Sequence, residues 1–97
     1  MRRTRILATI GPASQSADVI AALLAAGVDA FRLNFSHGTH SEHAELCRRI
    51  REVSEAAGRD TTILQDLSGP KIRTGRLAGP MALEAGSLLT IERGDFV

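Results

Sequence analysis

Short apolar runs and amphipathic segments alternate along the first two thirds of the chain. The run RILATI, residues 5–10, ends at Gly11-Pro12 and is typical of a short buried strand. Residues 29–34 and 61–67 predict a second and a third strand. Longer segments with helical periodicity separate these three runs.

The first helix is predicted over residues 16–26. Its apolar positions recur at helical spacing and form one stripe: Val19, Ile20, Leu23 and Leu24. Either Ser14 or Ser16 can cap its start, because a serine hydroxyl accepts a hydrogen bond from a backbone N–H that the helix leaves unpaired. Gly27 follows at the position where many helices end in the left-handed conformation.

The second helix is predicted over residues 40–57. Thr39 followed by Glu42 forms a capping box at its start, and Gly58 marks its end. Its apolar face contains Leu46, Ile50, Val53 and Ala57. Basic and acidic residues alternate on the remaining surface and predict i,i+4 ion pairs in solvent rather than a binding patch: Glu45, Arg48, Arg49, Arg51, Glu52 and Glu55. Arg59, which follows Gly58, is expected to lie in solvent.

The order of these elements is strand, helix, strand, helix, strand, which predicts an α/β fold with parallel strands and right-handed crossovers. The pattern changes after Ser68, where glycine and proline interrupt short extended pieces. We therefore expect two domains, with residues 1–69 as part of an α/β domain and residues 70–97 as the start of a small β domain. A complete (β/α)8 barrel needs about 250 residues, so this chain of 97 residues cannot form one alone.

Composition narrows the classes of function. The net charge of +1 argues against a general nucleic-acid partner, and three Phe without Trp or Tyr provide no platform for stacking bases. Cys47 is the only cysteine, which excludes an intramolecular disulfide and a cysteine metal site. The apolar segments 6–10 and 19–28 are too short for an export signal or a membrane crossing. We therefore expect a cytoplasmic protein with no membrane partner.

Polar side chains gather at the end of the second strand. Alternation along a strand places Arg32, Asn34 and Ser36 on one face, and on the other face Phe31, Leu33 and Phe35. Two interpretations stay open. The three polar groups either bond to neighbouring backbone and stabilise a loop, or they provide one Arg for an anion and two oxygen donors for a hard cation.

The third strand contributes further polar groups to the same edge. Asp66 ends that strand and lies beside the second strand in a parallel sheet. It is either a cap or turn residue, or the charged member of an all-oxygen cation site. If residues 71–74 are extended, Lys71 and Arg73 share a face and bring positive charge close to the same strand ends.

Three histidines follow the second strand at a spacing of three: His37, His40 and His43. No HExxH motif or Cys/His pair accompanies them, so a zinc site is not predicted. His37 is the best candidate among them for contact with a ligand, because it follows the polar strand end. The chain has neither GxGxxG nor GxxxxGK[ST], so a bound phosphate must be held by Arg side chains and cations.

Three segments together resemble the pyruvate kinase family. They are residues 9–14 (TIGPAS), 31–38 (FRLNFSHG) and 64–75 (LQDLSGPKIRTG), in the family's order. The resemblance implies transfer of a phosphoryl group from phosphoenolpyruvate to ADP, giving pyruvate and ATP. It also implies a homotetramer and a (β/α)8 TIM barrel with a β domain inserted after the third strand.

The resemblance assigns roles to particular residues. Arg32 contacts the transferring phosphoryl group, and Arg73 contacts the nucleotide phosphates, so both are catalytic candidates. The nucleotide site is lined by Asn34, Phe35, Ser36 and His37. A monovalent cation, K⁺ in many relatives, is bound by Asn34, Ser36, Asp66 and the backbone carbonyl of Leu67. The residues that bind Mg²⁺ in this family, and the Lys that contacts the transferring phosphoryl group, lie beyond the end of this chain.

One departure from the family pattern concerns the cation. Many relatives have Glu at the position of Lys71, with Thr and Lys at the positions of Leu67 and Ser68. Relatives with Lys at position 71 typically do not need K⁺, so we expect K⁺ to be dispensable here. Two alternatives to a catalytic pyruvate kinase segment stay open. One is a non-catalytic phosphate-binding or assembly fragment, and the other is a citrate-lyase-type aldolase barrel, against which the SGPKIRTG motif argues.

Overall fold

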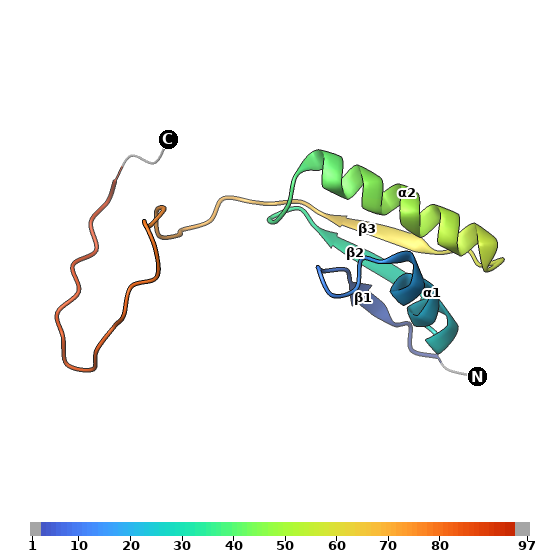
Figure 1. Ribbon diagram of the computed structural model, residues 1–97, viewed down its shortest axis with the longest axis horizontal. Coiled ribbons are helices and arrows are strands. Elements are labelled where there is room, and N and C mark those ends of the chain that lie inside the picture. Colours follow the sequence, from blue (N-terminus) through green and yellow to red (C-terminus); the bar gives the residue numbers. More distant parts are fainter. Residues whose placement is uncertain (1–2, 95–97) are drawn as a thin grey trace.

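The computed structural model describes residues 3–94. Its elements follow the predicted order: β1 (Leu7–Thr9), α1 (Ala17–Ala26), β2 (Ala30–Asn34), α2 (His40–Ala56) and β3 (Thr62–Asp66). The three strands form one parallel sheet in the order β1-β2-β3 (Figure 1). The α/β class and the parallel arrangement are therefore confirmed.

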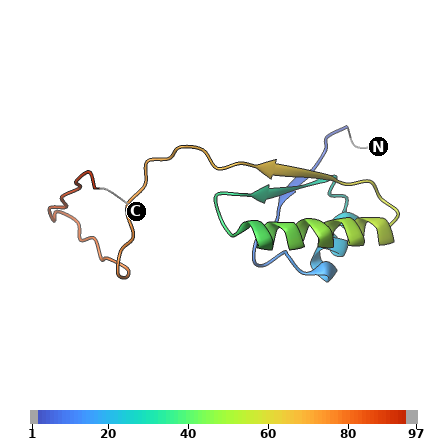
Figure 2. The same ribbon diagram turned by 90° about the horizontal axis from the view of Figure 1, so that it is seen from above.

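Both helices cover the same face of the sheet (Figure 2). The core lies between them and the strands, and its largest fully buried side chains are Ile20, Leu24, Phe31 and Ile50. Burying each of these side chains stabilises the fold by about 1.5–3 kcal/mol. On β2, Phe31 and Leu33 point into this core, so the predicted alternation of faces is confirmed there.

The first strand is only partly buried, which differs from the prediction. Leu7 and Thr9 are exposed, while Ala8 packs against the core. The difference arises because helices cover one face of the sheet and leave the other face open. The strand is also shorter than predicted, although the Ile10 N–H still donates to the Arg32 carbonyl at 3.1 Å.

Local hydrogen bonds explain where α1 begins and ends. The Ser16 hydroxyl accepts from the Val19 N–H at 3.3 Å, so Ser16 is the cap. The Ser14 hydroxyl instead accepts from the Gly11 N–H at 2.9 Å and stabilises the turn after β1. Gly27 ends the helix in the left-handed conformation, with φ of 108°, as predicted.

The capping box at the start of α2 is confirmed. The Thr39 hydroxyl accepts from the Glu42 N–H at 3.2 Å, and the Glu42 carboxylate accepts from the Thr39 N–H at 2.7 Å. The helix ends at Ala56, and Ala57 is an exposed cap residue rather than part of the apolar face as predicted. The Ala57 N–H still donates to the Val53 carbonyl at 3.0 Å, and the chain leaves the helical conformation at Gly58, whose φ is 66°.

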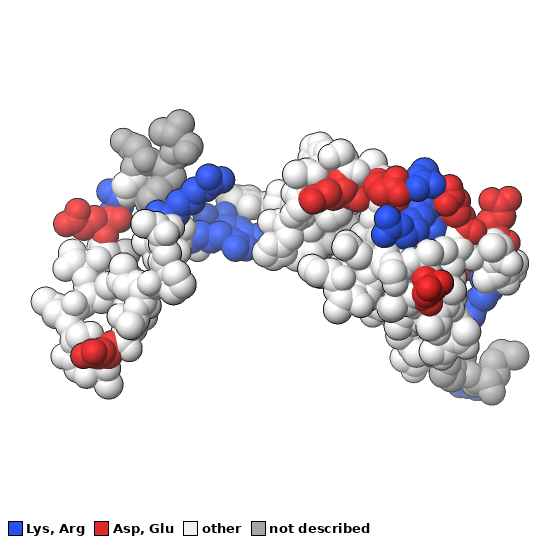
Figure 3. Space-filling model, in the orientation of Figure 1, with Lys and Arg blue, Asp and Glu red and all other residues white. Residues whose placement is uncertain are grey.

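Ion pairs run along the outer surface of α2, where acidic and basic side chains lie next to one another (Figure 3). Arg48 pairs with both Glu45 and Glu52, and Arg49 approaches Glu45 at 3.6 Å. The hydrogen bond from Arg48 lowers the pKa of the Glu45 carboxyl. The predicted pairs are therefore present for Arg48 and Arg49, whereas Arg51 donates to the Thr61 carbonyl at 2.7 Å.

Arg59 is exposed, as predicted, but it also makes a contact that the sequence did not indicate. Its Nη1 donates to the Leu24 carbonyl at 2.6 Å and so pairs a carbonyl at the end of α1. This contact joins residues 35 positions apart. It arises because the turn after α2 brings Arg59 beside the end of the first helix.

Residues 67–94 extend away from the sheet as an irregular segment (Figure 1). No helix or strand occurs in this part of the described chain, and its large apolar residues are exposed, among them Leu67, Ile72 and Leu88. The radius of gyration is 18.8 Å, whereas a compact chain of 100 residues has about 13 Å. The β domain starting at residue 70 stays a prediction. Within residues 3–94, neither helix is long and apolar enough to cross a membrane.

Candidate functional site

The polar residues predicted from the sequence meet at the carboxyl ends of β2 and β3. In the sheet register, Thr9 lies beside Arg32, and Asn34 lies beside Asp66. Residues of this row alternate with the buried Phe31 and Leu33, so they occupy the sheet face that the helices leave open. Two neighbouring parallel strands thus bring residues 34 positions apart into direct contact.

Arg32 is held by side chains from both neighbouring strands. Its Nε donates to Oδ2 of Asp66 at 2.9 Å, and its Nη2 contacts the same oxygen. Its Nη1 donates to Oγ1 of Thr9 at 3.2 Å. The guanidinium is therefore oriented before any ligand binds, and 29% of the side-chain surface is still exposed to an incoming anion.

Asn34 and Ser36 form a second small cluster with Lys71. The Asn34 side-chain oxygen accepts from the Ser36 N–H at 3.1 Å. This is a bond to neighbouring backbone that stabilises the loop, as one of the two interpretations of the polar strand end expects. Lys71 reaches back from the extended segment, and its Nζ donates to the Ser36 hydroxyl at 3.0 Å. The structure therefore brings the ammonium group of Lys71 to the polar strand end.

Arg73 is not brought into this cluster. It is exposed and makes no hydrogen bond or ion pair with any residue in the described range. The Leu67 side chain is exposed too, whereas the predicted cation ligand is its backbone carbonyl. Both residues lie on the irregular segment after β3, and their proposed roles stay predictions.

The loop after β2, residues 35–38, packs against the first turns of α2. The His37 N–H donates to the Asn34 carbonyl at 3.2 Å, and the His37 carbonyl lies 2.6 Å from Nε2 of His43. The Phe35 ring stacks on the His43 ring, with centroids 4.2 Å apart. Among the described residues, no three His, Cys, Asp or Glu side chains are grouped so that they could hold a metal ion together.

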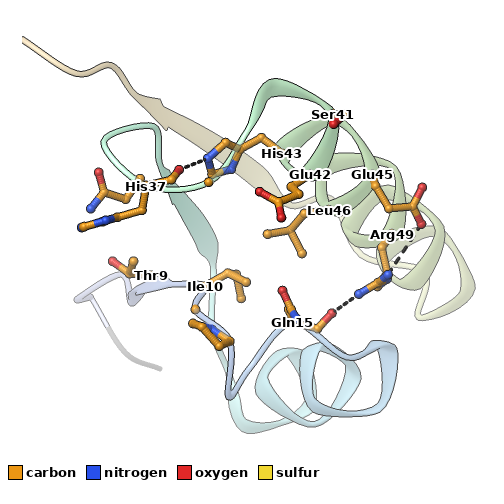
Figure 4. Close-up of a pocket in the computed structure, with 14 residues that line it drawn as sticks. Thr9, Ile10, Gln15, His37, Ser41, Glu42, His43, Glu45, Leu46 and Arg49 are labelled. Carbon is orange, nitrogen blue, oxygen red and sulfur yellow. Dashed lines mark hydrogen bonds and ion pairs between the residues drawn. The ribbon is translucent and has the colours of Figure 1, made fainter. Parts of the chain in front are cut away.

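A cavity of about 930 Å³ opens beside this loop, between the turn after β1 and the start of α2 (Figure 4). Two of the predicted nucleotide-site residues, Asn34 and His37, line it. The sequence arguments missed the other polar lining residues, including Thr9, Gln15, Glu42, His43 and Arg49. Of these residues, Thr9 could have been identified from the sequence, because it lies in the TIGPAS motif. It lines the cavity and also accepts a hydrogen bond from Arg32.

Comparisons with known proteins point to one family. The family model described as "Pyruvate kinase, barrel domain" matches residues 1–95. A pyruvate kinase of Agrobacterium vitis is 52% identical over 89 residues, which are 91% of this chain and 18% of that protein. Pyruvate kinase 2 of Synechocystis is 48% identical over 93 residues, which are 93% of this chain and 16% of that protein.

A solved structure supports the same assignment. The crystal structure of a pyruvate kinase from Cryptosporidium parvum superimposes with a TM-score of 0.73 and 40% sequence identity. The superposition covers 76% of this chain and 15% of that one, so this chain spans less than a fifth of the length of these relatives. The sequence motifs, the parallel β-α-β-α-β fold and these matches together show that the chain belongs to the pyruvate kinase family and corresponds to part of its barrel domain.

Proposed function

We propose that this chain acts as part of a longer pyruvate kinase, called the parent enzyme below. It contributes one wall of a site that transfers a phosphoryl group from phosphoenolpyruvate to ADP, giving pyruvate and ATP. The observation that carries the proposal is the preoriented guanidinium of Arg32. It is held by Asp66 and Thr9 at the strand ends, and Thr9 also lines a large cavity.

Arg32 is suited to contact the transferring phosphoryl group. Phosphoryl transfer depends mostly on positioning and on neutralising negative charge in the transition state. A guanidinium that is already fixed by two neighbouring strands needs little reorganisation when the charge develops. Arg73 is proposed to contact the nucleotide phosphates, and its exposed position on the extended segment leaves it able to move toward them.

The cavity beside residues 34–38 is the proposed nucleotide site. Its volume of about 930 Å³ is in the range of known small-molecule sites. Asn34 and His37 line it directly. Phe35 and Ser36 belong to the same loop, and we propose that they fix its position without lining the cavity. Phe35 packs on α2, and Ser36 accepts a hydrogen bond from Lys71.

The oxygen donors of the proposed cation site are already engaged. The Asn34 oxygen accepts from Ser36, the Ser36 hydroxyl accepts from Lys71, and Oδ2 of Asp66 accepts from Arg32. This arrangement fits an ammonium group better than a bound K⁺, which would need these oxygens as ligands. We therefore propose that Lys71 replaces the monovalent cation and that K⁺ is dispensable.

Other features of the parent enzyme rest on the family alone. Mg²⁺, when bound, would neutralise charge on the phosphoryl groups through ligands outside this chain. The homotetramer and the cytoplasmic location likewise stay proposals.

A coupled assay on the full-length protein tests the proposed function. We expect turnover that requires both phosphoenolpyruvate and ADP and that releases pyruvate and ATP in equal amounts. The 97-residue chain alone should show no turnover. If the full-length protein binds ADP but produces no pyruvate, the function is wrong and the non-catalytic phosphate-binding alternative is favoured.

A further inference from the structure

We propose that His43 is a positioning residue for nucleotide binding, acting through the His37 loop, which we define as residues 35–38. This inference rests on the proposed function, because it names the ligand whose binding the loop controls. His43 belongs to the first turns of α2, whereas the loop follows β2. Their contact joins the helix to the wall of the cavity (Figure 4).

A hydrogen bond from His43 holds the loop backbone. Nε2 of His43 lies 2.6 Å from the His37 carbonyl oxygen. A carbonyl oxygen only accepts hydrogen bonds, so the proton of the His43 ring is on Nε2. His43, which itself lines the cavity, therefore donates to the peptide of His37, another lining residue, and it determines how far this peptide lies from α2.

Phe35 orients the His43 ring for this bond. The two rings are stacked, with centroids 4.2 Å apart and planes inclined by 13°. Phe35 directly follows β2, so its position is set by the strand. The loop is thus held at both ends, at Phe35 by stacking and at His37 by the hydrogen bond.

The other ring nitrogen shows that His43 is not an optimal residue for packing alone. Nδ1 is buried and has no hydrogen-bond partner among the described residues. A buried polar atom without a partner lowers stability, and a phenylalanine ring would pack here without that cost. The feature of His43 that Phe cannot supply is the N–H donated to His37.

Gly38 keeps the loop close enough for this contact. Its φ of +75° is in the left-handed region, and a Cβ there would lie 3.1 Å from the Glu42 carboxylate and 3.3 Å from Nε2 of His43. Glu42 is also the acidic member of the capping box with Thr39. The start of α2 therefore holds the His37 loop through two contacts, the bond of His43 to the His37 carbonyl and the stacking of His43 on Phe35.

Two substitutions in the full-length protein separate the hydrogen bond from the ring. His43→Phe keeps a ring against Phe35 but removes the donor, and His43→Gln keeps a donor at a similar distance but removes the ring. For His43→Phe we expect the KM for ADP and the Kd for ADP to rise about tenfold, which is the loss of one good hydrogen bond. The kcat and the KM for phosphoenolpyruvate should change less than about twofold, and the Tm should stay equal or rise.

His43→Gln should restore ADP affinity to within about threefold of the unmodified protein. His40→Phe is the matched control, because His40 is exposed and its ring lies 6.0 Å from that of Phe35. That variant should leave ADP affinity unchanged.

The possible outcomes distinguish this inference from the proposed function. If the unmodified protein binds ADP without turnover, the proposed function fails, but the Kd comparison still decides the role of His43. An unchanged Kd for ADP in His43→Phe would overturn the inference, and so would a lower Tm with equal losses in kcat and in affinity for both substrates. If the unmodified protein does not bind ADP, both proposals are wrong.

Discussion

Arg32 owes its geometry to three strands rather than to its own neighbours in the chain. Its guanidinium contacts Thr9 on one side and Asp66 on the other, and both partners are strand-end residues. The guanidinium of Arg32 uses three nitrogen atoms to contact its two partners, whereas a Lys has a single ammonium group. The role of this residue is therefore sensitive even to a conservative substitution.

We predict that Arg32→Ala lowers kcat/KM of the parent enzyme by about a hundredfold, or roughly 3 kcal/mol of transition-state stabilisation. Arg48→Ala is the control, because Arg48 makes only exposed ion pairs on α2, and it should change kcat/KM less than about twofold. Arg59 is unsuitable as a control, since it bonds to the Leu24 carbonyl. Steady-state kinetics with both substrates provides the comparison, and equal losses in the two variants would contradict the role of Arg32.

Lys71 provides a second prediction at this scale. A tethered ammonium group supplies positive charge without an ion-binding equilibrium, so the parent enzyme should work equally well in Na⁺ and K⁺ buffers. Lys71→Glu should lower activity and make the remaining activity rise with K⁺, because it removes the ammonium group, frees the Ser36 hydroxyl and adds a carboxylate beside Asn34 and Asp66.

A K⁺ titration at constant ionic strength measures both effects. Arg76→Glu is the matched control, since it makes the same charge reversal on the same exposed segment. It should not create a response to K⁺. Strong K⁺ activation of the unmodified enzyme would show that Lys71 does not replace the cation.

Among the elements, α2 has the most complete set of local signals. Its capping box, its Glu–Arg pairs and the Gly58 turn all involve residues within a few positions of one another. The start of this helix also carries the contacts of the His37 loop with His43. The cap therefore contributes both to the helix and to one wall of the candidate site.

A synthetic peptide of residues 38–58 isolates the contribution of the cap. Thr39→Ala removes the hydroxyl that accepts from the Glu42 N–H, and it should reduce helix stability by about 0.5–1 kcal/mol. Thr39→Ser keeps a hydroxyl and should retain most of the helicity. Circular dichroism of the three peptides at neutral pH is the measurement, and equal helicity in all three would mean that the cap does not stabilise α2.

At the scale of the molecule, the sheet is covered on one side only. Leu7 is 51% exposed and Leu64 is 44% exposed, and both lie on the face away from the helices. In a parallel α/β protein both faces of the sheet are normally covered. The outer edges of β1 and β3 are also unpaired within the described residues, and such edges can pair with other chains.

We therefore predict that the 97-residue chain, produced alone, associates or binds a dye specific for apolar surface. Sedimentation velocity and dye fluorescence report these two properties. Replacing Leu7 and Leu64 together with Ser should reduce dye binding without loss of helical signal, because neither side chain is in the core. A sharp monomer that binds no dye would contradict the prediction.

Much of the fold follows from the sequence because its causes are local. The faces of β2 alternate with a period of two residues, so the burial of Phe31 and Leu33 was predictable. Capping by Thr39 and Glu42, and the helix end at Gly27, depend on residues no more than a few positions apart. The sequence also predicted the strand-end position of Arg32, Asn34 and Asp66.

The tertiary structure alone decided how these residues are connected. The contacts of Arg32 with Asp66 and of Lys71 with Ser36 span 34 and 35 residues and depend on strand register and on the path of the extended segment. The bond of Arg59 to the Leu24 carbonyl was not predicted, and Leu7 was wrongly predicted to be buried, because each depends on which elements pack beside it. His43 is the clearest case. In the sequence it is only one of three histidines near the start of a predicted helix. Its bond to the His37 carbonyl exists because the loop after β2 folds back onto α2.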